Sequence, residues 1–261
     1  MSRSLFVFVA VALIGLPGLV SGQTQPANDP QAVALAAQSI AALTGGTTIT
    51  DVTLTGNVIW NPDSDDQTGP ATLSASGAGE SRMDLSLSGG TRSEIRDAST
   101  GTALGKWISQ SGTSGNYASH NCQTDAVWFF PALGSLAVAP STVLSYIGQE
   151  SRNGATVQHI QSYVYQASQT VGSLQQQLST LDFYLDATSL LPTAIVFNAH
   201  PDTDATSNIA TEVDFSNYQA VSGVLVPMHI QRFFQGTLTI DLTVSSATFN
   251  TGIALSTFTT N

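Results

Sequence analysis

Apolar and polar residues alternate with a period of two over most of the chain, which is typical of half-buried β-strands. This pattern begins at residue 49 and is rich in Val, Ile and Thr, with Gly, Pro and Asn between the segments. The predicted strands are 49–60, 71–75, 81–88, 91–97, 103–109, 143–150, 156–165, 181–186, 193–200, 208–218, 224–234 and 237–250. Because no helical segments alternate with them, we expect neighbouring strands to pair in one antiparallel sheet.

One long helix is predicted before the strands. Asp29 is a suitable N-cap, Pro30 suits the first turn, and Gly45 with Gly46 ends the segment. The residues expected on its packed face are Val33, Ala37, Ile40, Ala41 and Leu43. Their near-helical spacing predicts a helix that packs against the sheet.

Two later segments depart from the strand pattern. Residues 124–136 place large apolar side chains within two turns, but Pro131 interrupts any long helix, so short helical pieces are expected. Residues 171–178 fit either a polar-faced helix or a flexible Gln-rich link. These are the only non-strand elements predicted in the middle of the chain.

The N-terminus has the pattern of a signal peptide: a positive charge at Arg3, an apolar run from Leu5 to Val20, and small residues before Gln23. As a helix that run would span roughly 24 Å, short of the roughly 30 Å hydrocarbon core that a membrane anchor must cross. We therefore expect residues 1–22 to be a cleaved signal peptide, 23–28 a flexible spacer, and 29–261 a single domain.

Composition narrows the range of partners. The formal net charge is −11, and only 7 of the 261 residues are Lys or Arg, so nucleic acid and anionic lipid surfaces are disfavoured. A lipid-modified N-terminus would need a cysteine at the cleavage point, whereas the single cysteine is Cys122. Cys122 is expected to be a small buried residue. The mature protein is expected in the periplasm or outside the cell, with no stable transmembrane segment.

Two C-terminal stretches resemble LolA-like proteins, the superfamily of periplasmic lipoprotein carriers and lipoprotein-sorting relatives. Residues 181–197 carry an Asp followed by Leu-Pro, here Asp186, Leu191 and Pro192. Residues 213–230 match a second hairpin signature at Asn217, Tyr218, Val221, Gly223, Val224, Val226 and Pro227. Gly223 would permit a tight turn, and Pro227 would lie where its strand needs no donor.

The resemblance implies a fold that is mainly β (α+β): a large curved antiparallel sheet or half-barrel, with an N-terminal helix and short mid-chain helices over its concave face. Carriers of this kind hold acyl chains inside the half-barrel, and some relatives fasten the helical lid with an arginine. Arg82, Arg92 and Arg96 lie on predicted early strands, but no motif assigns that role to any of them.

Catalytic motifs are absent: the chain has no Gly-x-Ser-x-Gly, no Walker phosphate loop and no Gly-x-Gly-x-x-Gly after a strand. His120 lies beside Cys122, but a polar turn explains this pair better than nucleophilic chemistry. His200, Asp202 and Asp204 could in principle bind a divalent cation, yet their composition is that of an ordinary hairpin loop. We therefore predict no catalytic residues, no metal site and no cofactor.

The sequence favours an exported, non-catalytic protein that binds an apolar ligand, a lipid or a lipid-modified partner, in a half-barrel. The expected ligand-binding residues are Trp128, Phe129, Phe130, Leu133 and Leu136, because large aromatic side chains on a mobile helix could cover a cavity. The alternative is a structural or interaction domain of the cell envelope with a closed core and no ligand. A continuous interior cavity would favour the first hypothesis. The oligomeric state is left open.

Overall fold

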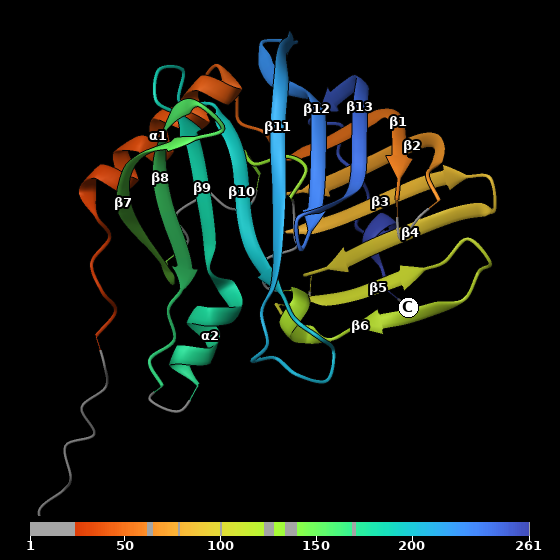
Figure 1. Ribbon diagram of the computed structural model, residues 1–261, viewed down its shortest axis with the longest axis horizontal. Helices are drawn as coiled ribbons and strands as arrows, with labels where there is room; N and C mark the ends of the chain where they lie inside the picture. Colours follow the sequence, from red (N-terminus) through yellow and green to blue (C-terminus); the bar gives the residue numbers. More distant parts are fainter. Residues whose placement is uncertain are drawn as a thin grey trace, which may run out of the picture.

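The structure, a computed structural model, describes residues 24–61, 65–77, 79–99, 101–122, 128–133, 140–168 and 171–260. Within these ranges the strands form one antiparallel sheet that is not closed, in the order β6-β5-β4-β3-β2-β1-β13-β12-β11-β10-β9-β8-β7 (Figure 1). The strands are β1 (Asp51–Trp60), β2 (Gln67–Ser76), β3 (Glu80–Leu87), β4 (Gly90–Asp97), β5 (Leu104–Ile108), β6 (Ser114–Tyr117), β7 (Thr142–Arg152), β8 (Ala155–Val164), β9 (Leu181–Asp186), β10 (Pro192–Ala199), β11 (Ile209–Val221), β12 (Val224–Phe234) and β13 (Thr237–Phe249). The predicted antiparallel sheet is confirmed.

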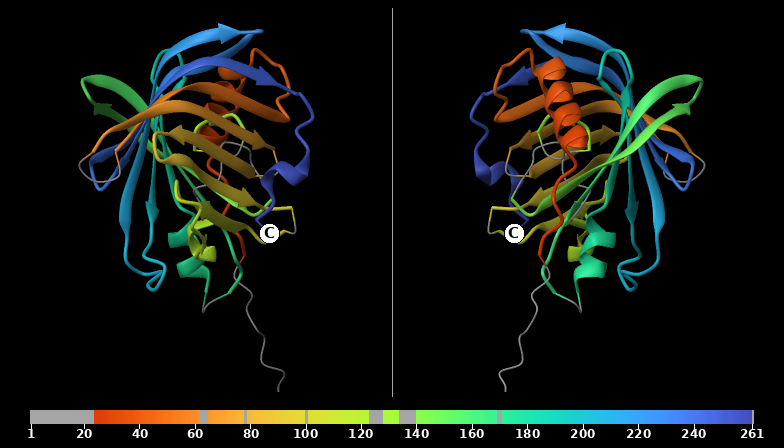
Figure 2. Two further views of the ribbon diagram at one scale, coloured as in Figure 1. Left: turned by 90° about the vertical axis from the view of Figure 1, so that its right-hand side faces the viewer. Right: turned by 90° about the vertical axis from the view of Figure 1, so that its left-hand side faces the viewer.

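The sheet is strongly curved, and it wraps around α1 (Pro30–Thr44) (Figure 2). We call the face that carries the core the inner face and the opposite one the outer face. Curvature is helped by a register shift in the pairing of β1 with β13 between Thr55 and Gly56. A Cβ at Gly56 would lie only 2.1 Å from the Thr243 carbonyl oxygen, so the close approach there requires glycine.

α1 begins where the sequence predicts, since the Asp29 carboxylate accepts hydrogen bonds from the amides of Gln31 and Ala32. The predicted packed face was partly wrong, because Ala37 and Ala41 are exposed. The side chains that α1 buries are Ala32, Ala36, Ser39, Leu43 and Thr44. Small residues on this stripe let the helix lie close to the inner face, where it contacts β7 and β12.

The remaining helical pieces are short: η1 (Ser119–Cys122), α2 (Gly172–Ser179) and η2 (Leu255–Phe258). For residues 171–178 the helix, rather than the flexible link, is confirmed. No helix in the described part of the chain is long and apolar enough to cross a membrane.

Two strands differ from the prediction. β6 was missed because Ser-Gly-Asn-Tyr shows no apolar alternation, and pairing with β5 alone defines it. β2 starts at Gln67 rather than residue 71, since Gly69 and Pro70 look like turn residues but pair with Val58 and Asn57 of β1. In both cases long-range pairing overrides local propensity.

The two hairpin signatures have the expected physical basis. The Asp186 carboxylate accepts hydrogen bonds from the amides of Thr188 and Ser189, which closes the β9–β10 turn and lowers the pKa of Asp186. Gly223 has φ of +85° in the β11–β12 turn. β13 pairs with β12 only from His229 onward, so at Pro227 β12 has one ladder neighbour and the missing donor costs nothing.

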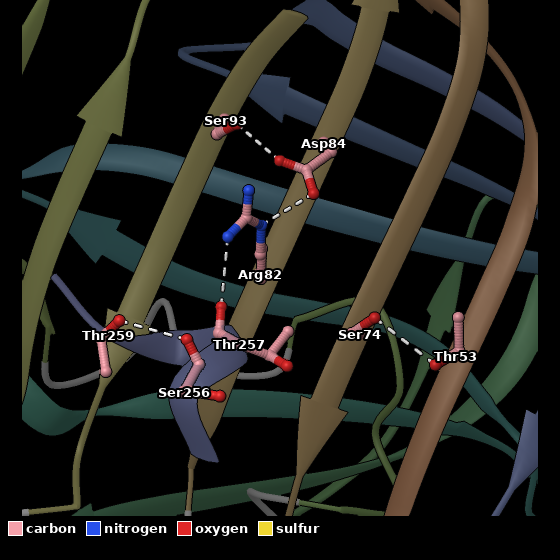
Figure 3. Close-up of polar contacts among 8 residues, drawn as sticks. All are labelled: Thr53, Ser74, Arg82, Asp84, Ser93, Ser256, Thr257 and Thr259. Atoms are coloured by element: carbon pink, nitrogen blue, oxygen red, sulfur yellow. Dashed lines mark hydrogen bonds and ion pairs between the residues drawn. The ribbon is translucent and has the colours of Figure 1, made fainter. Parts of the chain in front are cut away.

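The outer face of β3 and β4 is covered by η2 (Figure 3). Arg82 donates to the Asp84 carboxylate at 2.7 Å and to the Thr257 carbonyl at 3.2 Å, and Ser93 donates to the other oxygen of Asp84. Phe258 is fully buried. The C-terminal segment is therefore part of the packed structure.

Candidate functional site

The aromatic segment singled out by the sequence lies against the inner face of the sheet. Trp128, Phe129, Phe130 and Leu133 are all buried and belong to the core cluster. The Trp128 and Phe129 rings meet edge-on with centroids 5.5 Å apart, and Phe130 packs against Phe249 at 5.8 Å. Leu136, the fifth predicted site residue, lies outside the described residues.

A cavity of about 330 Å³ lies beside this segment, between two parts of the curved sheet. Met83, Trp107 and Tyr117 line it from β3, β5 and β6. Sites for small ligands typically have volumes of roughly 300–1,000 Å³. The cavity is thus at the lower end of that range.

The opposite wall comes from the C-terminal strands, with Phe197 on β10, Ile209 on β11 and Phe234 on β12. Trp128 and Phe129 also contribute to the lining, whereas Phe130 and Leu133 do not. Of the four described residues that the sequence singled out, two therefore face the cavity and two pack in the core beside it.

Glu94 of β4 is the buried carboxylate of this site. Arg92 donates to one of its oxygens at 2.9 Å and Arg232 of β12 donates to the other at 3.3 Å. Burial alone would raise the pKa of Glu94, but the two guanidinium groups outweigh it and hold that pKa below its usual value. The ion pair of Glu94 with Arg232 connects the two walls across 138 residues of chain.

Both arginines also stack on aromatic rings. The Arg232 guanidinium lies 5.3 Å from the ring centroid of Trp128, and that of Arg92 lies 5.1 Å from Trp60. These are cation–π distances. Arg232 is thus paired with Glu94 and covered by an aromatic ring, and aromatic and aliphatic residues make up more than half of the cavity lining.

The three arginines considered from the sequence fall on different faces. Arg92 and Arg96 are on the inner face, and Arg82 is on the outer face under η2. Arg96 lines the cavity and donates from Nε to the Cys122 carbonyl at 2.8 Å, with a further bond to the Gly79 carbonyl. Cys122 is buried, as expected, and lines the same cavity.

The loop after β10 lies beside the cavity and is hydrogen-bonded to η1. His200 and Asp202 line the cavity, whereas Asp204 is turned to the loop itself, where its carboxylate accepts from Thr206 and Ser207. Those hydrogen bonds lower the pKa of Asp204 to about 2. Within the described residues no group of three His, Cys, Asp or Glu side chains is arranged to hold a metal ion.

The two other histidines on strands, His159 and His229, are on the outer face and do not converge. His159 contacts Asp182 at 2.8 Å, while His229 contacts Asp241 at 2.8 Å and the Ser216 hydroxyl at 3.2 Å. Ser216, His229 and Asp241 are linked in the order of a hydrolase triad. However, they lie on three neighbouring strands, on the open outer surface of the sheet. None of them lines the cavity.

Sequence reasoning missed Glu94, Arg232 and His200 as cavity residues. The strand Thr91–Asp97 places Arg92, Glu94 and Arg96 on one face and Ile95 on the other, so alternation alone suggests that the charges face water. The signal that could have indicated these cavity residues was the charged set Arg92, Glu94 and Arg96 at alternate positions of one strand, together with Arg232 far along the chain. Nothing in the sequence shows that these residues meet.

No protein-family model matches the sequence, and no curated protein matches it. Among solved structures, a domain from Vibrio parahaemolyticus provisionally assigned as an outer membrane lipoprotein-sorting protein superposes with a TM-score of 0.56 at 12% identity, over 87% of this chain and 96% of that one. A DUF1329 family protein from Desulfovibrio piger gives a TM-score of 0.51 at 9% identity, over 88% and 96%. A LolA superfamily protein from Nitrosomonas europaea gives 0.49 at 8% identity, over 87% and 97%.

At such identities the likeness concerns the fold alone. It extends over most of both chains, well beyond the two C-terminal hairpins that first suggested it. The chain therefore has the fold of the Vibrio parahaemolyticus domain, and the predicted resemblance to lipoprotein-sorting proteins is confirmed at the level of the fold.

Proposed function

We propose that this protein is an exported, non-catalytic carrier that binds the apolar chain of a lipid or of a lipid-modified protein in the cavity beside Trp128 and Phe129. The cavity itself carries the proposal. It lies between the walls of an open sheet, and aromatic and aliphatic side chains form most of its lining. Apolar lining with a few placed polar groups is what small-ligand sites share.

The electrostatics of the cavity agree with an apolar ligand. Glu94 forms ion pairs with both of its arginine neighbours, so a hydrocarbon chain would not strip water from an unpaired carboxylate there. The cavity volume lies at the lower end of the range of small-ligand sites, so we expect one bound molecule.

The fold adds a reason to name a lipidated ligand. The solved domain from Vibrio parahaemolyticus is assigned to lipoprotein sorting, and this chain shares its fold over most of its length. Export follows from the predicted signal peptide at residues 1–22, which lies outside the described residues. Cleavage would be tested by the intact mass of the protein secreted from a bacterial host, with loss of residues 1–22 expected.

The decisive experiment is native mass spectrometry of the purified mature protein, followed by denaturation and lipid extraction. We expect reproducible extra mass that is released as lipid, or a mass shift of one bound molecule when a fatty acid or lysolipid is added. A clean mass with no shift on either addition would instead support the closed-core interaction domain.

A pair of matched variants ties binding to the cavity. Ala199→Phe places a ring in the cavity wall and is expected to abolish the mass shift. Ala220→Phe adds the same ring at an exposed position of β11 and should leave binding unchanged. If both variants bind like the parent, the ligand lies elsewhere and the proposed site is wrong.

A further inference from the structure

Two large aromatic side chains line the cavity without filling the core. Trp107 of β5 and Tyr117 of β6 contribute to the cavity wall, and among the described residues neither belongs to the buried core cluster. Both side chains are only partly buried. Trp107 is paired with Glu94 of β4, which places it on the inner face of the sheet. The fold therefore presents these rings to the cavity.

A glycine on the neighbouring strand makes room for each ring. Trp107 is paired with Gly115 of β6, where a Cβ would lie only 2.6 Å from the indole Cζ2. Tyr117 is paired with Gly105 of β5, where a Cβ would lie 3.0 Å from the phenol ring. Each ring thus covers a position that has no side chain and lies along the sheet, an arrangement that also protects glycines near a sheet edge. We call Trp107 and Tyr117 the aromatic floor of the cavity.

The wall opposite this floor is aromatic as well. Phe197 of β10 and Phe234 of β12 line it, together with Trp128 and Phe129. A saturated hydrocarbon chain gains mainly from the area that it buries, which aliphatic side chains would supply equally well. A planar ring gains in addition from offset-stacked and edge-on contacts with other rings. So many rings around one cavity favour a ligand that has a ring of its own.

The charged side chains of the lining balance one another. Glu94 and Asp202 are acidic, whereas Arg96 and Arg232 are basic. Arg232 donates to Glu94, Arg96 donates to backbone carbonyls, and Asp202 accepts from the Asn121 amide at 3.3 Å. Because these groups already have partners and opposite signs, the lining favours a ligand without net charge.

We propose that the ligand is a neutral lipid that carries a planar unsaturated ring, such as an aromatic or quinone ring, on its apolar chain, and that this ring stacks on the aromatic floor. The inference rests on the proposed function, because it names the class of lipid that the cavity takes. A saturated acyl chain would occupy the same space but would bind less tightly.

The test compares two hexanols that carry either a phenyl or a cyclohexyl ring at the end away from the hydroxyl group. The cyclohexyl compound is the more apolar, so burial alone favours it. By displacement of a bound fluorescent probe, we nevertheless expect the parent protein to bind the phenyl compound about threefold more tightly. In the double variant Trp107→Leu, Tyr117→Leu the wall stays apolar but the floor is lost. There the cyclohexyl compound should bind about threefold more tightly, so that the ratio of the two affinities changes about tenfold.

A further variant disturbs the floor without removing a ring. Gly115→Ala places a methyl group where the Trp107 indole lies and must displace it, so the preference for the phenyl compound should be lost although every aromatic residue remains. The matched control is Tyr163→Leu, which removes a partly buried tyrosine of β8 away from the cavity lining and should keep the preference. Circular dichroism would verify that each variant is folded.

The outcomes separate this inference from the proposed function. The same affinity ratio in the parent and in the double variant would overturn the role of the aromatic floor and leave the carrier function standing. If neither hexanol binds while a fatty acid or lysolipid gives a mass shift, the ligand is an acyl chain and the ring is wrong. If none of these molecules binds, both proposals fail.

Ring-current shifts provide a direct measurement of stacking. On addition of the phenyl compound, the side-chain proton resonances of Trp107, assigned through Trp107→Leu, should move upfield, because an aromatic ring shields protons that lie over its face. The cyclohexyl compound has no ring current and should cause smaller shifts. Equal shifts with the two compounds would contradict stacking on Trp107.

Discussion

Glu94 illustrates how single residues organise this molecule. Its carboxylate bonds to Arg92 on its own strand and to Arg232 on β12, and all three side chains are mostly buried. Removing one member of a buried charge set leaves the others uncompensated, which costs more than the set itself contributes to stability. Glu94 is therefore expected to matter far more for stability than an exposed carboxylate.

We predict that Glu94→Gln lowers the free energy of unfolding by about 2 kcal/mol, because two partly desolvated guanidinium groups lose their counter-charge. Urea denaturation would measure it. The control is Glu150→Gln on the outer face, where the side chain is 47% exposed, and there a change below about 0.5 kcal/mol is expected. Equal effects of the two substitutions would contradict the role given to Glu94.

Asp214 of β11 provides a pH-dependent prediction. Burial, together with a hydrogen bond and charge repulsion from Glu212, raises the pKa of Asp214 to about 6. Because this folded-state pKa is above the usual value of 3.8, the native state holds an extra proton between these two pH values. The stability from Asp214 is full below about pH 4 and is lost as the pH rises through about 6.

The substitution Asp214→Asn keeps the group neutral at every pH. At pH 8 the variant should therefore be more stable than the parent by about 1 kcal/mol, a value reduced because solvent screens a half-buried carboxyl. Below pH 4 the two proteins should have the same urea midpoint. A difference that does not change between pH 4 and pH 8 would refute the assigned cause.

At the scale of elements, α1 depends on its first turn. The Asp29 carboxylate accepts from the amides of Gln31 at 2.7 Å and Ala32 at 3.3 Å, and the Asp29 amide donates to the Leu144 carbonyl on β7 at 2.9 Å. The cap therefore both starts the helix and fixes it to the last strand of the sheet. Intrinsic propensity alone would not determine where the helix lies.

Loss of this cap is the prediction at this scale. Asp29→Ala should destabilise the protein by about 1 kcal/mol, because two helix amides lose their acceptor. Gln31→Ala changes an exposed side chain on the same turn and should be neutral. Thermal denaturation followed by circular dichroism would compare them, and an equally large effect of both would argue against capping by Asp29.

At the scale of the whole molecule, the open sheet has a middle and two ends. β1, β13 and β12 lie near its centre with neighbours on both sides, whereas β6 and β7 are terminal strands. β6 has four residues, none of them buried, and the C-terminal half of β7 is largely exposed. Stability should therefore fall from the centre of the sheet toward both ends.

Hydrogen exchange measured by mass spectrometry would test this gradient. Amides of β1, β13 and β12 should exchange most slowly, and those of β6 and of Gly148–Arg152 in β7 most quickly, since the latter have few buried contacts. Uniform protection along the sheet would show that it unfolds as one unit and would contradict the gradient.

Much of the fold is encoded locally. Period-two alternation predicts nearly all strands, because each strand buries one face and exposes the other. The cap at Asp29 fixes the start of α1, and turn residues around Asp186 and Gly223 fix hairpins. β6 could not be predicted in this way, since it is a strand only because it pairs with β5.

The cavity depends on contacts between distant segments. The aromatic run at Trp128 and Phe129 is visible in the sequence, but the pairing of β1 with β13 and the curvature of the sheet decide that it faces Phe197 and Arg232. Likewise, alternation places Glu94 among charged residues without showing that its partner is 138 positions away. Local sequence thus determines the strands and turns, whereas tertiary packing determines which side chains are desolvated together, and with them the site.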